Sequence, residues 1–113
     1  LKDMSGALLP IVVSHGEGRA IMPGLAMDDL GSNEQIAMRF SDHFGESTKR
    51  YPHNPNGSPG GLTAVTSEDG RALAMMPHPE RVFRAMQYSW RPEDWKEDSP
   101  WMRLFRNARV WVG

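Results

Sequence analysis

Short apolar runs bounded by turn residues predict β-strands in the first half of the chain. Residues 8–14 form an apolar run with β-branched side chains, which predicts a strand with one buried face. Residues 15–18 contain two glycines and predict a turn, after which residues 19–22 are expected to return as a second strand. In residues 36–41 apolar side chains fall at alternate positions, so this segment predicts a strand with one apolar face.

A hairpin is predicted in the second half of the chain. Residues 54–61 are the densest turn segment, and their Asn-Gly pair favours a tight reversal because both residues tolerate a positive φ. Two apolar runs follow, at residues 62–66 and 71–76, on either side of a Glu-Asp-Gly turn at residues 68–70. This arrangement predicts two strands that form a hairpin or lie next to each other.

Helical spacing is expected in the middle and at the end of the chain. Short helices are predicted at residues 25–30 and after Ser32, and the pattern turns helical again after residue 81. Ser99-Pro100 predicts a helix start, since serine caps a helix and proline suits its first position. The side chains expected to bury one stripe of this helix are Trp101, Leu104, Phe105, Ala108 and Val112. Its arginines lie off the stripe, where we expect a solvated face rather than a nucleic-acid site.

The amino-acid composition and net charge limit the classes of function that the chain can have. The chain has 113 residues, which fits one domain or part of one, and its 39% apolar and 24% charged residues are ordinary for a globular protein. A net charge of −1 predicts neither a nucleic-acid partner nor an anionic membrane partner. There are no cysteines, so disulfides and thiolate metal sites are excluded, and a cytoplasmic location is expected. The four histidines show no helical metal-site spacing, so no metal is expected in this segment. No Gly-rich phosphate loop occurs, and no cofactor is expected in this segment either.

The most distinctive chemistry lies in the hexamer Met76-Pro77-His78-Pro79-Glu80-Arg81. Because His78 precedes a proline, its backbone is biased toward an extended conformation. Residues i and i+2 of an extended chain point to the same side, with Cα atoms roughly 6.6 Å apart, so His78 and Glu80 are placed to hydrogen-bond. A carboxylate on one imidazole nitrogen fixes the tautomer, and the other nitrogen then serves to take a proton from a nucleophile. By spacing alone, such a pair in a loop is more often a surface feature.

The nucleophile that would complete this site is missing. The chain has no cysteine, and none of its serines sits in a recognisable nucleophile motif. The sequence therefore contains half of a catalytic apparatus.

Several ordered segments resemble one family. Residues 75–84 closely resemble the end of the glutamine amidotransferase domain of phosphoribosylformylglycinamidine synthases. Further similar segments are Val13-Ser14-His15-Gly16-Glu17-Gly18-Arg19, Tyr51-Pro52-His53-Asn54-Pro55-Asn56-Gly57-Ser58, Ser89-Trp90-Arg91-Pro92-Glu93-Asp94-Trp95 and residues 97–109. These segments follow one another over nearly the whole chain and are much more specific than a His-x-Glu spacing.

The resemblance implies a fold and a place in it. It is to the large, single-chain enzymes, whose amidotransferase domain is C-terminal, and it implies an α/β class I amidotransferase domain of flavodoxin-like, three-layer architecture with a mostly parallel sheet. Residues 1–113 would be the C-terminal half of that domain, with β-hairpins and a C-terminal helix. The nucleophilic cysteine and the oxyanion hole would lie in the half that precedes this chain.

The resemblance also implies an activity. Glutamine would be the substrate, hydrolysed to supply ammonia for the ATP-dependent amidation of formylglycinamide ribonucleotide in purine synthesis. His78 would be the general base of the triad and Glu80 its orienting acid. ATP and magnesium would bind the synthase domain, which is absent from this chain, and the rest of the polypeptide would be the partner. Two alternatives stay open: a non-catalytic domain that docks or regulates a synthase, and a structural fragment without a function of its own.

Other residues have two interpretations each. His15 and Glu17 either approach the glutamine site or are simple turn residues with local hydrogen bonds. Asn54, Asn56 and Ser58 either form the turn or line the mouth of the active site. The four tryptophans are expected to pack in the interior, or else to contact the synthase domain.

A half domain leaves an apolar sheet edge uncovered, so we expect this chain alone to be marginally stable, oligomeric or dependent on a partner. Analytical ultracentrifugation with a thermal melt measures this directly. A monomer that melts cooperatively would contradict the expectation.

Overall fold

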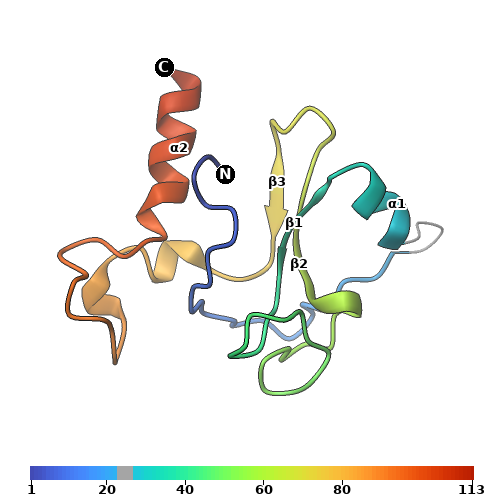
Figure 1. Ribbon diagram of the computed structural model, residues 1–113, viewed down its shortest axis with the longest axis horizontal. Coiled ribbons are helices and arrows are strands. Elements are labelled where there is room, and N and C mark those ends of the chain that lie inside the picture. The colour runs from blue at the N-terminus through green and yellow to red at the C-terminus, as the bar shows by residue number, and fades with distance from the viewer. Residues whose placement is uncertain (23–26) are drawn as a thin grey trace. The chain divides into compact units, whose positions relative to one another are not determined.

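The computed structural model describes residues 1–22 and 27–113, and the chain divides into two compact units (Figure 1). One unit combines Leu1–Val12 with His78–Gly113, and the other is Val13–Pro77. Each unit is therefore held by its own set of hydrogen bonds, and the first joins the two ends of the sequence.

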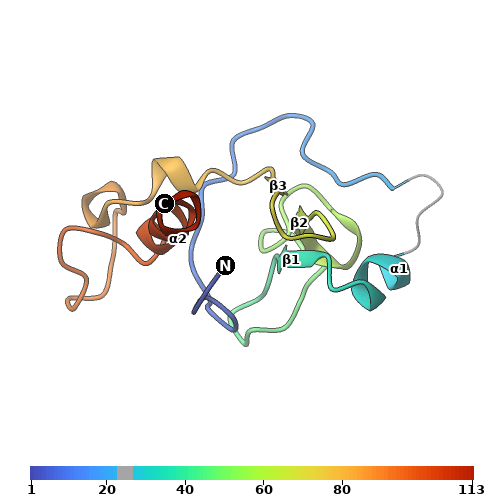
Figure 2. The same cartoon turned by 90° about the horizontal axis from the view of Figure 1, so that it is seen from above.

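A three-stranded antiparallel sheet organises the unit Val13–Pro77. Its strands are β1 (Ile36–Arg39), β2 (Leu62–Thr66) and β3 (Leu73–Met75), with β2 in the centre (Figure 2). The alternation along β2 buries Leu62 and Ala64 on one face of the sheet. The predicted strands in residues 36–41, 62–66 and 71–76 are thus confirmed, and β2 and β3 form the predicted antiparallel pair.

A Schellman motif ends α1 (Met27–Ser32) and turns the chain into β1. Glu34 adopts a φ of 55°, its N–H donates to the Gly31 carbonyl at 3.1 Å, and the Gln35 N–H donates to the Leu30 carbonyl at 2.9 Å. The prediction of a helix at residues 25–30 falls partly outside the described residues, since 25 and 26 are not among them. The second helix predicted after Ser32 is wrong, because this left-handed turn leads straight into a strand.

The loop between β1 and β2 is organised around the buried side chain of Asn54, which is only 2% exposed. Its amide nitrogen donates to the carbonyls of Thr48 and Ser58, both at 2.9 Å. Its amide oxygen accepts the Ser58 N–H at 3.1 Å. One side chain therefore satisfies three backbone groups, which keeps a glycine-rich loop in one conformation.

Two predicted strands are wrong. Residues 8–14 and 19–22 form no strand, although both are described. Pro10 has no N–H to give to a ladder, and its carbonyl instead accepts from the side chains of Trp101 and Tyr88. The hydrogen-bond partners of this segment at Pro10 are therefore side chains rather than a neighbouring strand.

In the other unit, α2 (Met102–Val112) follows the predicted Ser99-Pro100 start after one turn. Between His78 and this helix the chain forms two short 3₁₀ turns, η2 (Pro79–Arg81) and η3 (Ala85–Gln87), rather than the continuous helical pattern expected after residue 81.

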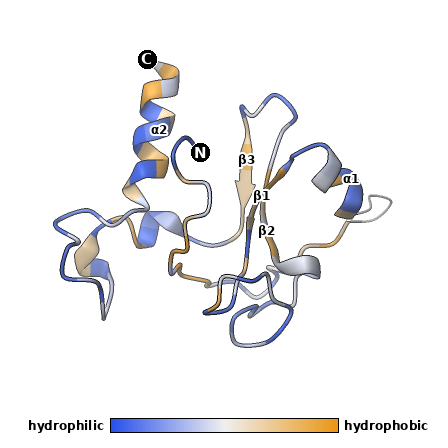
Figure 3. Cartoon of the chain, viewed as in Figure 1, coloured by the Kyte–Doolittle hydropathy of each residue, from blue (hydrophilic) through white to orange (hydrophobic). Residues whose placement is uncertain are grey.

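The predicted buried stripe of α2 is mostly wrong. Trp101 is 5% exposed, but Phe105 is 39% and Val112 76% exposed. Apolar and polar residues alternate along the helix in Figure 3, and among the described residues nothing buries its last turn. Of the arginines expected on a solvated face, Arg103 pairs with Asp3 and Arg106 with Asp98, in exposed positions.

Two glycines with similar backbone angles provide a test of the loop geometry. Gly61 has a φ of 72°, and a Cβ atom there would lie 2.8 Å from the Phe40 carbonyl oxygen, whereas at Gly70 (φ 68°) a Cβ meets nothing within 4 Å. We expect Gly70→Ala to lower the free energy of unfolding by about 1 kcal/mol through backbone strain. Gly61→Ala adds a steric clash and is expected to cost roughly 3 kcal/mol in total. Urea denaturation followed by far-UV circular dichroism measures both; equal losses would contradict the predicted close approach.

Candidate functional site

The backbone around His78 presents its side chain and that of Glu80 on one turn. His78 has φ −110° and ψ 82°, outside the helical region, as expected for a residue that precedes proline. Its N–H donates to the Val12 carbonyl at 2.8 Å, and its own carbonyl accepts the Arg81 N–H at 3.2 Å. The two prolines of the motif, which cannot donate, leave these few bonds to define the turn.

The predicted contact between the two side chains is present. His78 Nδ1 lies 2.6 Å from Glu80 Oε1, and the two side chains are 28% and 56% exposed. The hydrogen bond from His78 is the main cause that lowers the pKa of Glu80 below its ordinary value; the Glu80 backbone N–H and the charge of Arg81 act in the same direction. A carboxylate that accepts the Nδ1 proton leaves the lone pair of a neutral imidazole on Nε2, which is the form that a general base needs.

A second cluster brings together His15 and Asn56 in the unit Val13–Pro77. The Asn56 amide nitrogen lies 3.3 Å from His15 Nε2 and donates to the Gly18 carbonyl at 2.6 Å. The imidazole also packs over Gly18, where a Cβ atom would fall 1.6 Å from Nε2. The Asn56 amide therefore contacts His15 on one side. On the other side the imidazole packs closely against Gly18, which is possible because glycine has no side chain.

The same cluster continues to Ser58. Its hydroxyl donates to Asn56 Oδ1 at 2.9 Å and accepts the Ala20 N–H at 3.1 Å. At 1% exposure Ser58 lies inside its own loop, as Asn54 does, so both act as turn formers rather than as the lining of a mouth. Glu17 is exposed in the bend between His15 and Gly18.

The predicted site residues thus fall into two groups, one in each unit of the chain. His78 and Glu80 belong to the unit that contains His78–Gly113, and His15, Glu17 and Asn56 to Val13–Pro77. Within the described ranges, no three His, Asp or Glu side chains are arranged to hold a metal ion. Nor does any helix in those ranges combine the length and apolar character needed to cross a bilayer.

The four tryptophans differ in how far they are buried. Trp101 is buried, and Trp95 packs edge-on against Tyr88 with ring centroids 5.2 Å apart. Trp90 and Trp111 are 78% and 71% exposed, so the expectation of interior packing is wrong for these two.

Sequence reasoning missed the role of Ser99 beyond helix capping. Its hydroxyl is buried and donates to the Val82 carbonyl, two residues after Glu80. The Ser-Pro pair predicts a helix start. It does not indicate that the Ser99 hydroxyl donates to a carbonyl 17 residues earlier in the sequence.

The CobB/CobQ-like glutamine amidotransferase domain family matches residues 1–112. The chain belongs to this family. Glutamine is therefore the substrate indicated for the domain, and a glutamine-hydrolysing role is supported.

The ionisation of Glu80 tests the contact with His78. We expect the Glu80 carboxyl to titrate below its ordinary pKa of 4.5, and His78→Ala to raise that pKa by removing the main hydrogen bond. Because the folded-state pKa is lowered, the stabilisation is present above the ordinary pKa and is lost as the pH falls through the lowered one. A ¹³C NMR titration of the Glu80 carboxyl carbon measures this, with His43→Ala as the control. A Glu80 pKa that does not change in His78→Ala would contradict the contact.

Proposed function

We propose that this chain supplies the general base and the orienting acid for glutamine hydrolysis in an amidotransferase. The observation that carries this proposal is the 2.6 Å contact between His78 Nδ1 and Glu80 Oε1 on a proline-bounded turn. The family membership supports it, because the chemistry of the family is transfer of the glutamine amide nitrogen.

In the proposed mechanism His78 takes the proton of a thiol through Nε2, and Glu80 stabilises the imidazolium that forms. The thiolate attacks the side-chain carboxamide carbon of glutamine, a C–S bond forms, and the C–N bond breaks as the imidazolium returns the proton to the departing ammonia. Water, deprotonated by the same imidazole, then hydrolyses the thioester to glutamate and restores the thiol. This chain has no cysteine, so the thiol is supplied by another part of the complete polypeptide.

We further propose that the complete polypeptide is a phosphoribosylformylglycinamidine synthase of the large, single-chain type. The ordered motifs around Ser14, Asn56, His78, Trp90 and Ser99 support this assignment. Ammonia would then pass to a synthase domain outside this chain, where ATP and magnesium drive the amidation of formylglycinamide ribonucleotide in the cytoplasm. The complete amidotransferase domain would have the flavodoxin-like, three-layer fold, of which residues 1–113 form the C-terminal portion.

The His15–Asn56 cluster is our candidate for substrate binding in the same domain. An imidazole fixed by an amide and by packing on Gly18 offers a defined polar group at low conformational cost. Glu17, exposed in the adjacent bend, is the charged member of this candidate set.

A non-catalytic docking or regulatory domain is the second candidate function. The observation that favours it is the exposure of apolar side chains at the end of α2, where Val110 is 81% and Trp111 71% exposed. A surface of this kind is typical of a region that another protein segment covers.

Substitution of the base distinguishes the two functions. In the complete polypeptide we expect His78→Ala to abolish glutamine-dependent amidation, with a loss on the order of 10³-fold or more, because no group then activates the thiol. Glu80→Gln is expected to lower the rate less, since the base remains but loses its charged partner. Ammonia-dependent amidation should survive in both variants, and His43→Ala serves as the control. Full glutamine-dependent activity in His78→Ala would favour the non-catalytic function.

A further inference from the structure

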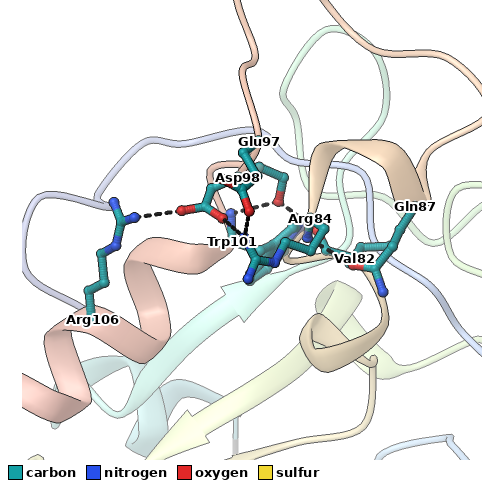
Figure 4. Close-up of polar contacts among 8 residues, drawn as sticks. Val82, Arg84, Gln87, Glu97, Asp98, Trp101 and Arg106 are labelled. Carbon is teal, nitrogen blue, oxygen red and sulfur yellow. Dashed lines mark hydrogen bonds and ion pairs between the residues drawn. The ribbon is translucent and has the colours of Figure 1, made fainter.

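The start of α2 is connected to both sides of the turn that carries His78 and Glu80. The connections come from Ser99 and Trp101, which are 3% and 5% exposed. Figure 4 shows the surrounding polar contacts, with Trp101 and Val82 beside the charged side chains of residues 84, 97, 98 and 106.

The first connection fixes the chain where it leaves the turn. The Val82 N–H donates to the Pro79 carbonyl at 3.1 Å and closes η2, while the Val82 carbonyl accepts the Ser99 hydroxyl at 2.5 Å. The Ser99 N–H donates to the Phe83 carbonyl at 2.9 Å, and Val82 itself is 2% exposed. The residue that ends the turn is thus held by a buried hydroxyl and by its own packing.

The second connection fixes the chain where it enters the turn. The His78 N–H donates to the Val12 carbonyl at 2.8 Å. Two residues before Val12, the Pro10 carbonyl accepts the Trp101 indole N–H at 2.8 Å and the Tyr88 hydroxyl at 2.9 Å. Trp101 therefore holds the segment against which the His78 backbone is bonded.

The charged side chains around this turn contribute less to fixing its backbone than Ser99 and Trp101 do. Arg84 Nη1 lies 2.6 Å from Glu97 Oε1 and 2.9 Å from Asp98 Oδ1, and Arg106 Nη2 lies 2.5 Å from Asp98 Oδ2. The arginines are 40% and 68% exposed and Glu97 is 83% exposed, so water and salt screen these pairs. The hydrogen bond of the Ser99 hydroxyl is buried, and that of the Trp101 indole is partly buried, so both are less accessible to solvent than the ion pairs.

We propose that Ser99 and Trp101 are positioning residues for the His78–Glu80 pair. The imidazole and the carboxylate are themselves partly exposed, so their mutual attraction alone holds them together only weakly. The start of α2 fixes the backbone that carries them, both before His78 and after Glu80. Neither Ser99 nor Trp101 takes part in the reaction; their effect on catalysis rests on the function proposed above.

The test uses Ser99→Ala, which removes the buried hydroxyl, and Trp101→Phe, which removes the indole N–H and keeps an aromatic ring. In the complete polypeptide we expect the kcat of glutamine-dependent amidation to fall on the order of tenfold in each variant, because small displacements of a base are costly. The KM for glutamine and the ammonia-dependent rate should not change. In the 113-residue chain, the pKa of the Glu80 carboxyl should rise toward its ordinary value as the bond from His78 loosens.

Matched controls separate positioning from a general loss of a hydroxyl or an indole. Ser67→Ala removes a hydroxyl that binds Asp69 in the β2–β3 turn, and Trp90→Phe alters an exposed indole. Ser67→Ala should retain the wild-type kcat, and both controls should retain the wild-type Glu80 titration in the 113-residue chain. If Ser99→Ala does not fold, as judged by far-UV circular dichroism, Trp101→Phe carries the test.

Two distinct failures can be recognised. If His78→Ala abolishes glutamine-dependent activity but Ser99→Ala and Trp101→Phe keep the wild-type kcat and Glu80 titration, the positioning role is wrong and the proposed function stands. If His78→Ala leaves glutamine-dependent activity intact, the proposed function is wrong. The Glu80 titration then decides the positioning role by itself, and an unchanged pKa in both variants would overturn it.

Discussion

The pairing of residues 83–85 with residues 97–99 is the constraint on which the unit formed by the two chain ends depends. Ala85 donates to the Glu97 carbonyl and Ser99 donates to the Phe83 carbonyl, both at 2.9 Å, around an isolated antiparallel bridge between Arg84 and Asp98. Backbone groups in a unit without a sheet must find partners one by one, since an unpaired buried group is costly. This short pairing places Ser99 at the start of α2 and so determines where the helix begins.

Hydrogen bonds to individual backbone groups also organise the unit Val13–Pro77. The loop before β2 carries several glycines and prolines, whose backbone would otherwise sample many conformations. Asn54 replaces the missing secondary structure with three hydrogen bonds to the backbone, and Ser58 extends the network to Ala20. In both units, then, a small buried polar side chain forms hydrogen bonds with backbone groups that a longer strand or helix would pair in a larger domain.

The sequence predicted best where the pattern depends on local chemistry. The alternation in residues 62–66 and the Glu-Asp-Gly turn both act within a few residues, and the structure has them where they were expected. The Ser-Pro pair also acts locally, and α2 begins within one turn of it, at Met102. The hydrogen bond between His78 and Glu80 is present as predicted, but the extended backbone from which it was predicted is wrong. Pro79–Arg81 form the 3₁₀ turn η2, and this turn brings the two side chains together.

The errors arise where a segment depends on distant partners. The apolar run at residues 8–14 has the composition of a strand, but strand formation requires a ladder partner, and Trp101 and Tyr88 take up the Pro10 carbonyl instead. The apolar stripe of α2 has helical spacing, but its side chains are mostly exposed. Periodicity predicts which side chains share a face of a helix, and it does not predict whether another segment packs against that face. The bond from Ser99 to Val82 joins residues 17 apart in sequence and has no local signature.

The exposure of the His78–Glu80 pair is consistent with a base that must meet a group from elsewhere. A histidine buried with its carboxylate would be more firmly placed, but no thiol could approach it, whereas at 28% exposure the imidazole remains accessible at the cost of weaker attraction to its partner. The pair must be both accessible and firmly placed, and fixing the backbone rather than the side chains satisfies both requirements. A proline-bounded turn that is held at both ends keeps the two side chains close together without covering them. Under the proposed function, different residues of the same unit would then provide access for the nucleophile and order for the base.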